Sequence, residues 1–92
     1  GNYESEHPSQ ADLIIEVAES SLEYDRGPKL RVYAECGVPE YWIVNLVERC
    51  IEVHRKPGGG RYWQVQRHAE GSVVCERHPE LELRIDEVLP AR

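Results

Sequence analysis

The most constraining stretch of the sequence is a short apolar run that a single carboxylate interrupts. Leu13, Ile14, Ile15 and Val17 form the nearly continuous apolar segment expected of a strand that is covered on both faces. Glu16 stands inside this segment, and a buried carboxylate is tolerated only with a cation, a metal or hydrogen-bond donors beside it. The run therefore predicts a buried strand. It leaves open whether Glu16 is a solvated or Arg-paired residue at the strand end or a functional residue.

Side chains alternate along a strand, so Glu16 is expected to share its face with Asp12, Ile14 and Ala18. Asp12 and Glu16 would then lie roughly 13 Å apart, at about 3.3 Å per residue. Ligands of one metal ion each lie about 2.1 Å from it, so these two carboxylates cannot share an ion. We therefore expect Asp12 to cap the entrance of the strand and not to act with Glu16.

The size and charge of the chain narrow its class. Ninety-two residues make one domain at most, and 40% hydrophobic with 30% charged residues is typical of a soluble globular protein. Eleven basic and seventeen acidic side chains give a net charge of −6, which argues against a general polyanion-binding surface. A locally basic groove, or an acidic metal site that acts on phosphate, stays compatible with this charge. The sequence has neither an apolar stretch of about 18 residues nor a secretory signal pattern, which predicts a cytoplasmic protein without a membrane span.

The cysteines and histidines do not form a recognisable metal or disulfide pattern. The three cysteines are Cys36, Cys50 and Cys75. The four histidines are His7, His54, His68 and His78. Because no Cys-x-x-Cys pair or metal-ligand spacing occurs, we expect reduced, partly buried thiols and surface or strand histidines.

After the first strand, the spacing predicts one helix from about Arg26 to Cys36. Asp25 would be its N-cap, Pro28 suits a first helical turn, and Gly37 would end it. Lys29 lies one turn before an apolar residue of the helix and so borders its apolar stripe. Its ammonium would either reach solvent with its stem along the core or turn back over the strand.

The rest of the chain has the pattern of an antiparallel β-meander. The expected elements are a central strand over 41–46, a strand over 49–56, a hairpin loop over 57–60, a strand over 61–68, a short strand over 73–75, an alternating segment over 81–85 and a last helical turn capped by Asp86. The three glycines of the hairpin loop precede a strand, so they do not form a nucleotide-binding loop. The fold class is therefore α/β (α+β). Residues 1–92 make one domain with an irregular lead-in (1–10), a strand-helix-strand-strand core (11–56) and a hairpin with C-terminal strands (57–92).

Four segments, in this order and spacing, resemble the Uma-type family of putative restriction endonucleases, within the PD-(D/E)xK nuclease superfamily. These segments are Ala11–Val17, Tyr24–Leu30, Tyr33–Ala34 and Gly37–Val44. The resemblance is close from about Asp12 to Val53 and looser beyond. It implies a restriction-endonuclease-like core and an Mg²⁺- or Mn²⁺-dependent endonuclease that hydrolyses DNA phosphodiester bonds.

The resemblance also implies roles for individual residues. Glu16 matches the metal-binding glutamate of the second core strand, and the main-chain carbonyl of Val17 matches an additional metal ligand. The superfamily lysine usually stands two residues after the glutamate, where this chain has Ala18. In the Uma-type branch the lysine lies on the following helix, and Lys29 matches that position. It would position or activate the attacking water.

Two departures from the family pattern qualify these roles. The family's metal-binding Asp belongs to an N-terminal half that this chain does not contain, which implies a partial nuclease domain. Such a fragment would bind metal weakly, would be inactive alone, and would self-associate through uncovered sheet. Asn45 stands where the family often has Asp, and we expect it to serve a turn or packing role.

Two other functions stay open at the level of sequence. One is a non-catalytic module that keeps the nuclease fold for dimerisation or protein binding. The other is a structural fragment without independent activity. The missing Asp, the acidic charge and the presence of Trp42 and Trp63 are compatible with the first of these.

Overall fold

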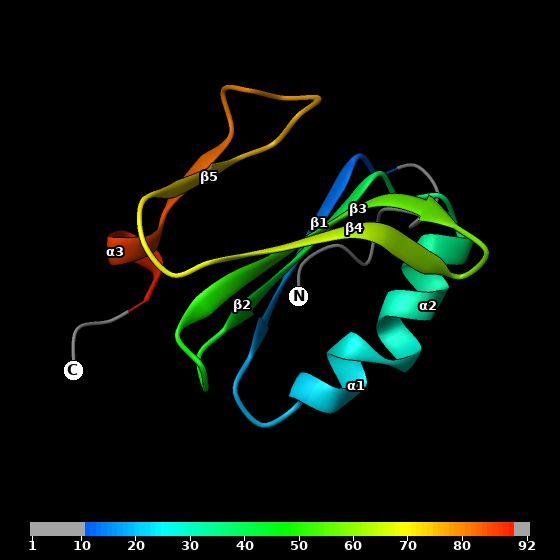
Figure 1. Cartoon of the computed structure of the whole chain (residues 1–92), viewed down its shortest axis with the longest axis horizontal. Coiled ribbons are helices and arrows are strands. Elements are labelled where there is room, and N and C mark those ends of the chain that lie inside the picture. Colours follow the sequence, from blue (N-terminus) through cyan, green and yellow to red (C-terminus); the bar gives the residue numbers. More distant parts are fainter. Residues whose placement is uncertain (1–10, 90–92) are drawn as a thin grey trace.

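The computed structural model describes residues 11–89, and the expected lead-in over residues 1–10 lies outside this range. Its centre is a mixed four-stranded sheet in the order β1-β2-β3-β4 (Figure 1). The strands are β1 (Leu13–Ala18), β2 (Glu40–Asn45), β3 (Cys50–Gly58) and β4 (Arg61–His68). β1 is parallel to β2, whereas β2, β3 and β4 pair antiparallel. The predicted α+β class and the meander over β2, β3 and β4 are confirmed.

Two short helices connect β1 to β2, in place of the single helix that the sequence predicted. α1 spans Leu22–Arg26 and α2 spans Pro28–Glu35. Proline disfavours the helical conformation in the residue before it, and Gly27 accordingly leaves the helical region (φ −104°, ψ −98°) and breaks the path. The prediction that Asp25 caps the helix is therefore wrong, because Asp25 lies inside α1 and is buried.

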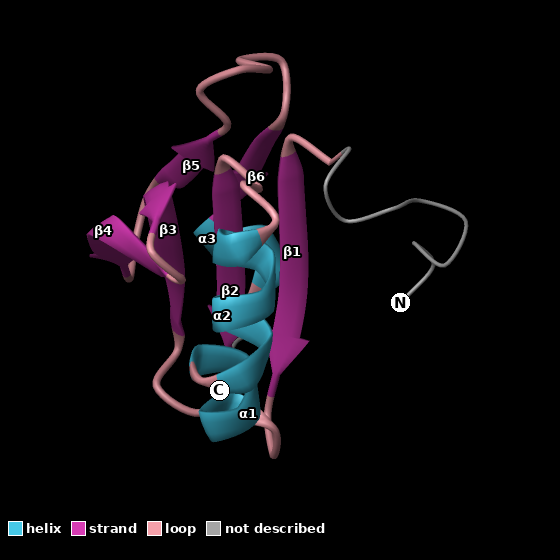
Figure 2. Ribbon diagram, turned by 90° about the vertical axis from the view of Figure 1, so that its right-hand side faces the viewer, coloured by secondary structure: helices cyan, strands magenta, loops and turns pink. Residues whose placement is uncertain are grey.

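The last strands do not extend the meander. β5 (Ser72–Val74) and β6 (Glu82–Arg84) pair antiparallel as a separate two-stranded sheet, and α3 (Ile85–Val88) follows directly. Asp86, the predicted cap, lies within α3, which has no side-chain cap. The small sheet covers the face of the main sheet opposite α1 and α2 (Figure 2).

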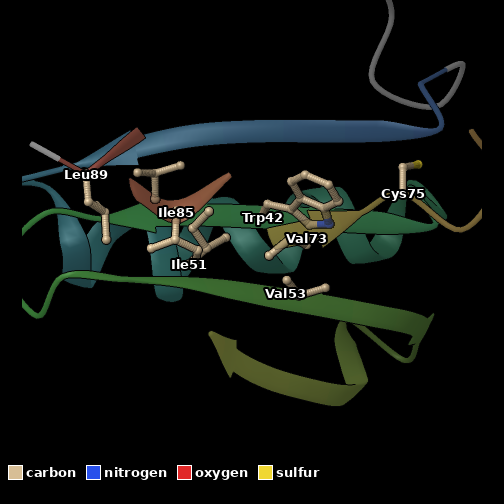
Figure 3. Packing of buried hydrophobic residues seen from close by; sticks show 8 residues of the cluster. Trp42, Ile51, Val53, Val73, Cys75, Ile85 and Leu89 are labelled. Atoms are coloured by element: carbon tan, nitrogen blue, oxygen red, sulfur yellow. The ribbon is translucent and has the colours of Figure 1, made fainter. Parts of the chain in front are cut away.

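The middle of the main sheet, β2 and the first five residues of β3, is buried on both faces, whereas the edge strands β1 and β4 are partly exposed. The strand that the apolar run of β1 predicted is present and packs on both faces, but Val17 is exposed, so the expected full burial is only partly confirmed. All six residues of β2 are buried, which confirms the predicted central strand. Figure 3 shows the cluster between the sheet and β5–β6. Its buried members are Trp42, Val44, Ile51, Val53, Val73, Cys75, Ile85 and Leu89. The cluster beneath the helices contains Ile14, Ala18, Ala34, Val38, Tyr41, Ile43 and Tyr62.

The β3–β4 hairpin is tighter than predicted. Pro57 and Gly58 belong to β3 and pair with β4, so only Gly59 and Gly60 form the turn. Both glycines have positive φ, +63° and +76°, as a two-residue type I′ hairpin turn requires. The predicted four-residue loop was too long because its first half pairs as strand.

Two polar contacts fasten the loop between β5 and β6 to the start of β2 and to the residue before β1. Glu40 is buried, and its carboxylate accepts hydrogen bonds from Trp42 Nε1 (2.9 Å), Arg55 Nε (2.9 Å) and the main-chain N–H of Glu76 (2.6 Å). Burial alone would raise the pKa of Glu40, but these contacts outweigh it and lower the pKa. At the other contact, Asp12 Oδ2 lies 2.8 Å from His78 Nε2. Within residues 11–89, no helix is long and apolar enough to cross a membrane.

Candidate active site beneath the crossover helices

Glu16 and Lys29 meet on the face of the sheet that the two helices cover. The other residues of the predicted Glu16 face, Ile14 and Ala18, pack in the helix-side cluster, which places Glu16 on the same side. Lys29 lies in the first turn of α2, and its Nζ is 2.9 Å from Glu16 Oε2. The side chain of Glu16 is 20% exposed and that of Lys29 is 30% exposed, so a ligand from solvent can reach the pair. Of the alternatives left open by the sequence, Lys29 therefore turns back over the strand.

Two further side chains complete this cluster. The Tyr33 hydroxyl donates a hydrogen bond to Glu16 Oε2 at 3.1 Å. Asp25 Oδ1 lies 3.6 Å from Lys29 Nζ, and Asp25 Oδ2 accepts a hydrogen bond from the Ser21 hydroxyl at 2.9 Å. Glu16, Asp25, Lys29 and Tyr33 are called the Glu16 cluster below.

The sequence analysis did not identify Asp25 as a site residue. The available signal was its position four residues before Lys29, where the two side chains share one helix face. The residue type of Asp25 predicted a helix cap instead. The structure instead gives Asp25 an exposed fraction of only 2%, with its carboxylate directed at the lysine.

The charges of the Glu16 cluster determine what chemistry its lysine can perform. Partial burial would lower the pKa of Lys29, but the contact with Glu16 outweighs it and raises the pKa. Burial and the Glu16 charge raise the pKa of Tyr33. Lys29 is therefore an ammonium at neutral pH. In this form it suits the stabilisation of negative charge and does not act as a general base.

The remaining residues of the sequence hypothesis lie close by or elsewhere. Val17 follows Glu16 in β1, and its side chain is 61% exposed. Ala18, where the resemblance implies that the superfamily lysine usually stands, is fully buried. Asp12 contacts Arg77 and His78 and does not belong to the Glu16 cluster, as the strand spacing predicted.

A second polar cluster lies on β3 and the turn before it, and we call it the β3 network. Ligand atoms of Glu48, Cys50 and Glu52 all lie within 4.8 Å of one another, a spacing that could hold a metal ion. Both carboxylates are already paired, because Arg26 contacts both of them and Arg67 Nη2 lies 2.8 Å from Glu48 Oε1. Burial raises the pKa of the Cys50 thiol, which keeps it protonated. These pairings make the β3 network a poor site for Mg²⁺ in this state.

Asn45 and His54 have structural roles beside the β3 network. Asn45 Oδ1 accepts a hydrogen bond from the Glu48 N–H (2.9 Å), and its Nδ2 donates to Glu52 Oε2 (2.9 Å). The predicted turn role of Asn45 is confirmed. His54 lies on β3 as expected but is buried, with its ring near those of Tyr41 and Tyr62. Its Nε2 is 3.6 Å from Glu52 Oε1.

The fold and the Glu16 cluster define a mixed α+β protein with an open carboxylate–ammonium pair beneath its crossover helices. The sequence model of the family Uma2, described as "Putative restriction endonuclease", matches residues 2–86. The match spans most of the chain, so the protein belongs to this family, and the resemblance is confirmed. No curated protein matches the chain.

Proposed function

We propose that this chain is part of a metal-dependent endonuclease that hydrolyses DNA phosphodiester bonds with Glu16 and Lys29 at its catalytic centre. The observation that carries the proposal is the 2.9 Å contact between Lys29 Nζ and Glu16 Oε2 on a partly exposed face. The contact places a carboxylate, which can bind a metal ion, beside a cation. In phosphodiester hydrolysis a metal ion can activate the attacking water, and a cation can stabilise the charge on the phosphoryl oxygens. Membership of a family of putative restriction endonucleases supports DNA as the substrate.

The donor set at Glu16 fits a hard divalent cation. Mg²⁺ and Mn²⁺ prefer oxygen ligands, and Mg²⁺ is commonly held by one or two carboxylates with several waters. Glu16 would supply a carboxylate oxygen and Val17 its main-chain carbonyl. When bound, the metal would polarise the phosphoryl group and lower the pKa of a coordinated water. The Lys29 ammonium would orient the attacking water and stabilise the charge that develops on the phosphoryl oxygens.

The test compares DNA cleavage by the complete gene product that carries this chain with cleavage by Glu16→Ala and Lys29→Ala variants. Each substitution is expected to lower cleavage of supercoiled plasmid in Mg²⁺ by about 100-fold or more. Glu23→Gln, an exposed carboxylate on α1, is the matched control and should retain activity. Undiminished cleavage by Glu16→Ala would remove the enzymatic proposal.

We further propose that the 92-residue chain is a partial nuclease domain and is inactive alone. The carboxylate nearest to Lys29 besides Glu16 is Asp25, which is buried, so within residues 11–89 Glu16 is the more accessible ligand of its cluster. Isothermal titration should therefore detect only weak Mg²⁺ binding, and a sub-micromolar dissociation constant would contradict this. We also propose that the intact protein is cytoplasmic.

The alternative function is a non-catalytic module for dimerisation or protein binding. It is favoured by Trp63 and Val65 on the edge strand β4, which are 66% and 53% exposed. An edge strand with exposed apolar side chains is suited to pairing with another chain. Under this proposal the protein self-associates, Trp63→Ser and Val65→Thr weaken the association in sedimentation experiments, and Glu16→Ala leaves it unchanged.

A further inference from the structure

We propose that Asp25 is a positioning residue that holds the Lys29 ammonium in place for the reaction at Glu16. The inference deepens the proposed nuclease function and rests on it. Asp25 is 2% exposed, so it does not reach a substrate that binds at the partly exposed Glu16. Its effect must therefore pass through Lys29, the cation that its carboxylate faces at 3.6 Å.

Asp25 is buried, and each oxygen of its carboxylate has a polar partner. A buried carboxylate requires a hydrogen-bond donor or a cation, and the two oxygens of Asp25 divide these roles. Oδ2 accepts the Ser21 hydroxyl hydrogen bond at 2.9 Å, and Oδ1 faces Lys29. The ammonium is thus held between Asp25 on one side and Glu16 on the other.

The contact matters most when Glu16 has a ligand. A divalent cation on the Glu16 carboxylate would weaken its attraction for the ammonium, because the two cations would share one negative charge. A lysine has a long and flexible side chain, so without a second anchor it would leave the site. Asp25 is only 2% exposed, so the same ligand would not reach its carboxylate, and Asp25 would keep Lys29 within reach.

The short helix α1 carries Asp25, and two contacts with the sheet, one buried and one partly buried, fix that helix in place. The Tyr41 hydroxyl of β2 donates a hydrogen bond to the main-chain carbonyl of Asp25 at 3.0 Å. The neighbouring Arg26 donates from Nε to Glu52 Oε2 of β3 at 3.1 Å. α1 has only five residues and no side-chain cap, so these contacts, and not its own helical bonds, determine where Asp25 lies.

The test uses Asp25→Asn, which keeps the size of the side chain and its ability to accept from Ser21 but removes its charge. In the complete gene product we expect kcat for DNA cleavage to fall about 10- to 100-fold, because a small misplacement of a reacting group has such an effect. KM for DNA and the affinity for Mn²⁺ should change by less than about twofold, since Asp25 contacts neither. Glu35→Gln, an exposed carboxylate on α2, is the matched control.

A second readout does not depend on activity. The ¹⁵N signal of the Lys29 ammonium should be sharp in the wild-type protein and broadened in Asp25→Asn. Ser21→Ala leaves the charge in place but frees the carboxylate, so it should give a smaller effect, and it serves as the test if Asp25→Asn does not fold. An unchanged signal or an unchanged kcat would overturn the positioning role. If the wild-type protein cleaves no DNA while Asp25→Asn still frees Lys29, the nuclease proposal fails and the positioning of Lys29 stands.

Discussion

Replacing Glu52 by glutamine removes the charge at the centre of the β3 network. Glu52 is 3% exposed and accepts hydrogen bonds from Arg26 Nε (3.1 Å) and Asn45 Nδ2 (2.9 Å). Burial would raise the pKa of Glu52, but the contacts with His54, Arg26 and Asn45 outweigh it and lower the pKa to about 2, against 4.5 for a free side chain. At about 1.4 kcal/mol per pH unit, this difference makes ionised Glu52 worth about 3 kcal/mol to the folded state.

The sign of this contribution fixes its pH dependence. The folded pKa is depressed, so the stabilisation is present above pH 4.5 and is lost as the pH falls toward 2. About 2 kcal/mol of it should already be lost at pH 3. Glu52→Gln should therefore be less stable than the wild type by about 3 kcal/mol at pH 7, and the difference should narrow to about 1 kcal/mol at pH 3.

Urea unfolding at pH 7, 5, 4 and 3 measures this difference, with the fluorescence of the buried Trp42 as the signal. Glu82→Gln, an exposed carboxylate on β6, is the matched control and should change the stability by less than about 0.5 kcal/mol at every pH. A Glu52→Gln difference that does not vary with pH would refute the assignment of the stabilisation to the ionised carboxylate. A difference below about 1 kcal/mol at pH 7 would refute its magnitude.

Further predictions concern the Asp12–His78 pair and the three cysteines. Asp12 raises the pKa of His78 by its 2.8 Å contact, so Asp12→Asn should lower the pKa of His78 in an NMR titration. The Asp12–His78 contact stabilises the fold below pH 6.5 and is lost as the pH rises through the raised pKa, so the amide protection factors in β5–β6, which correct for the intrinsic pH dependence of exchange, should fall there. Burial raises the pKa of the Cys50 and Cys75 thiols, so Ellman's reagent should modify the half-buried Cys36 first in the folded protein. Faster modification of Cys75 than of Cys36 would contradict this.

Periodicity predicted the parts of the fold that depend on local alternation. The apolar runs of β1 and β2 and the alternation in β3 and β4 gave strands within two residues of their observed bounds. It was harder to predict which sheet each strand joins, because this depends on which apolar surface the strand buries. Trp42, Ile51 and Val53 present an apolar face that β5, β6 and α3 bury, so the last strands fold over the sheet and do not extend it beyond β4.

Resemblance and spacing selected Glu16 and Lys29 as candidate site residues, but not the residues that surround them. Asp25 was misassigned because its residue type is typical of a helix cap, whereas it lies inside α1. The Arg26–Glu52 contact joins residues 26 positions apart, so no local spacing could predict it. Long-range pairing of this kind is decided by the register of the sheet, which a single sequence does not reveal.

That register explains why one face of the sheet carries two polar clusters with different properties. Glu16 is opposite Ile43, and Ile43 is opposite Glu52, so the two carboxylates lie in one row about 10 Å apart with an apolar side chain between them. Asp25 and Arg26 are consecutive residues at the end of α1, so their side chains point in different directions from the helix axis. Asp25 therefore contacts Lys29, whereas Arg26 contacts Glu52.

The two clusters differ in their balance of charge. In the β3 network, Arg26 and Arg67 compensate the two carboxylates of Glu48 and Glu52. In the Glu16 cluster, one ammonium faces two carboxylates, so a negative charge is left over where Glu16 is 20% exposed. A divalent cation gains more at an accessible site with uncompensated charge than at one where it must displace two guanidinium groups. This balance of charge supports the proposal of a metal ion at Glu16, whereas the carboxylate of Glu52 in the same row pairs with Arg26.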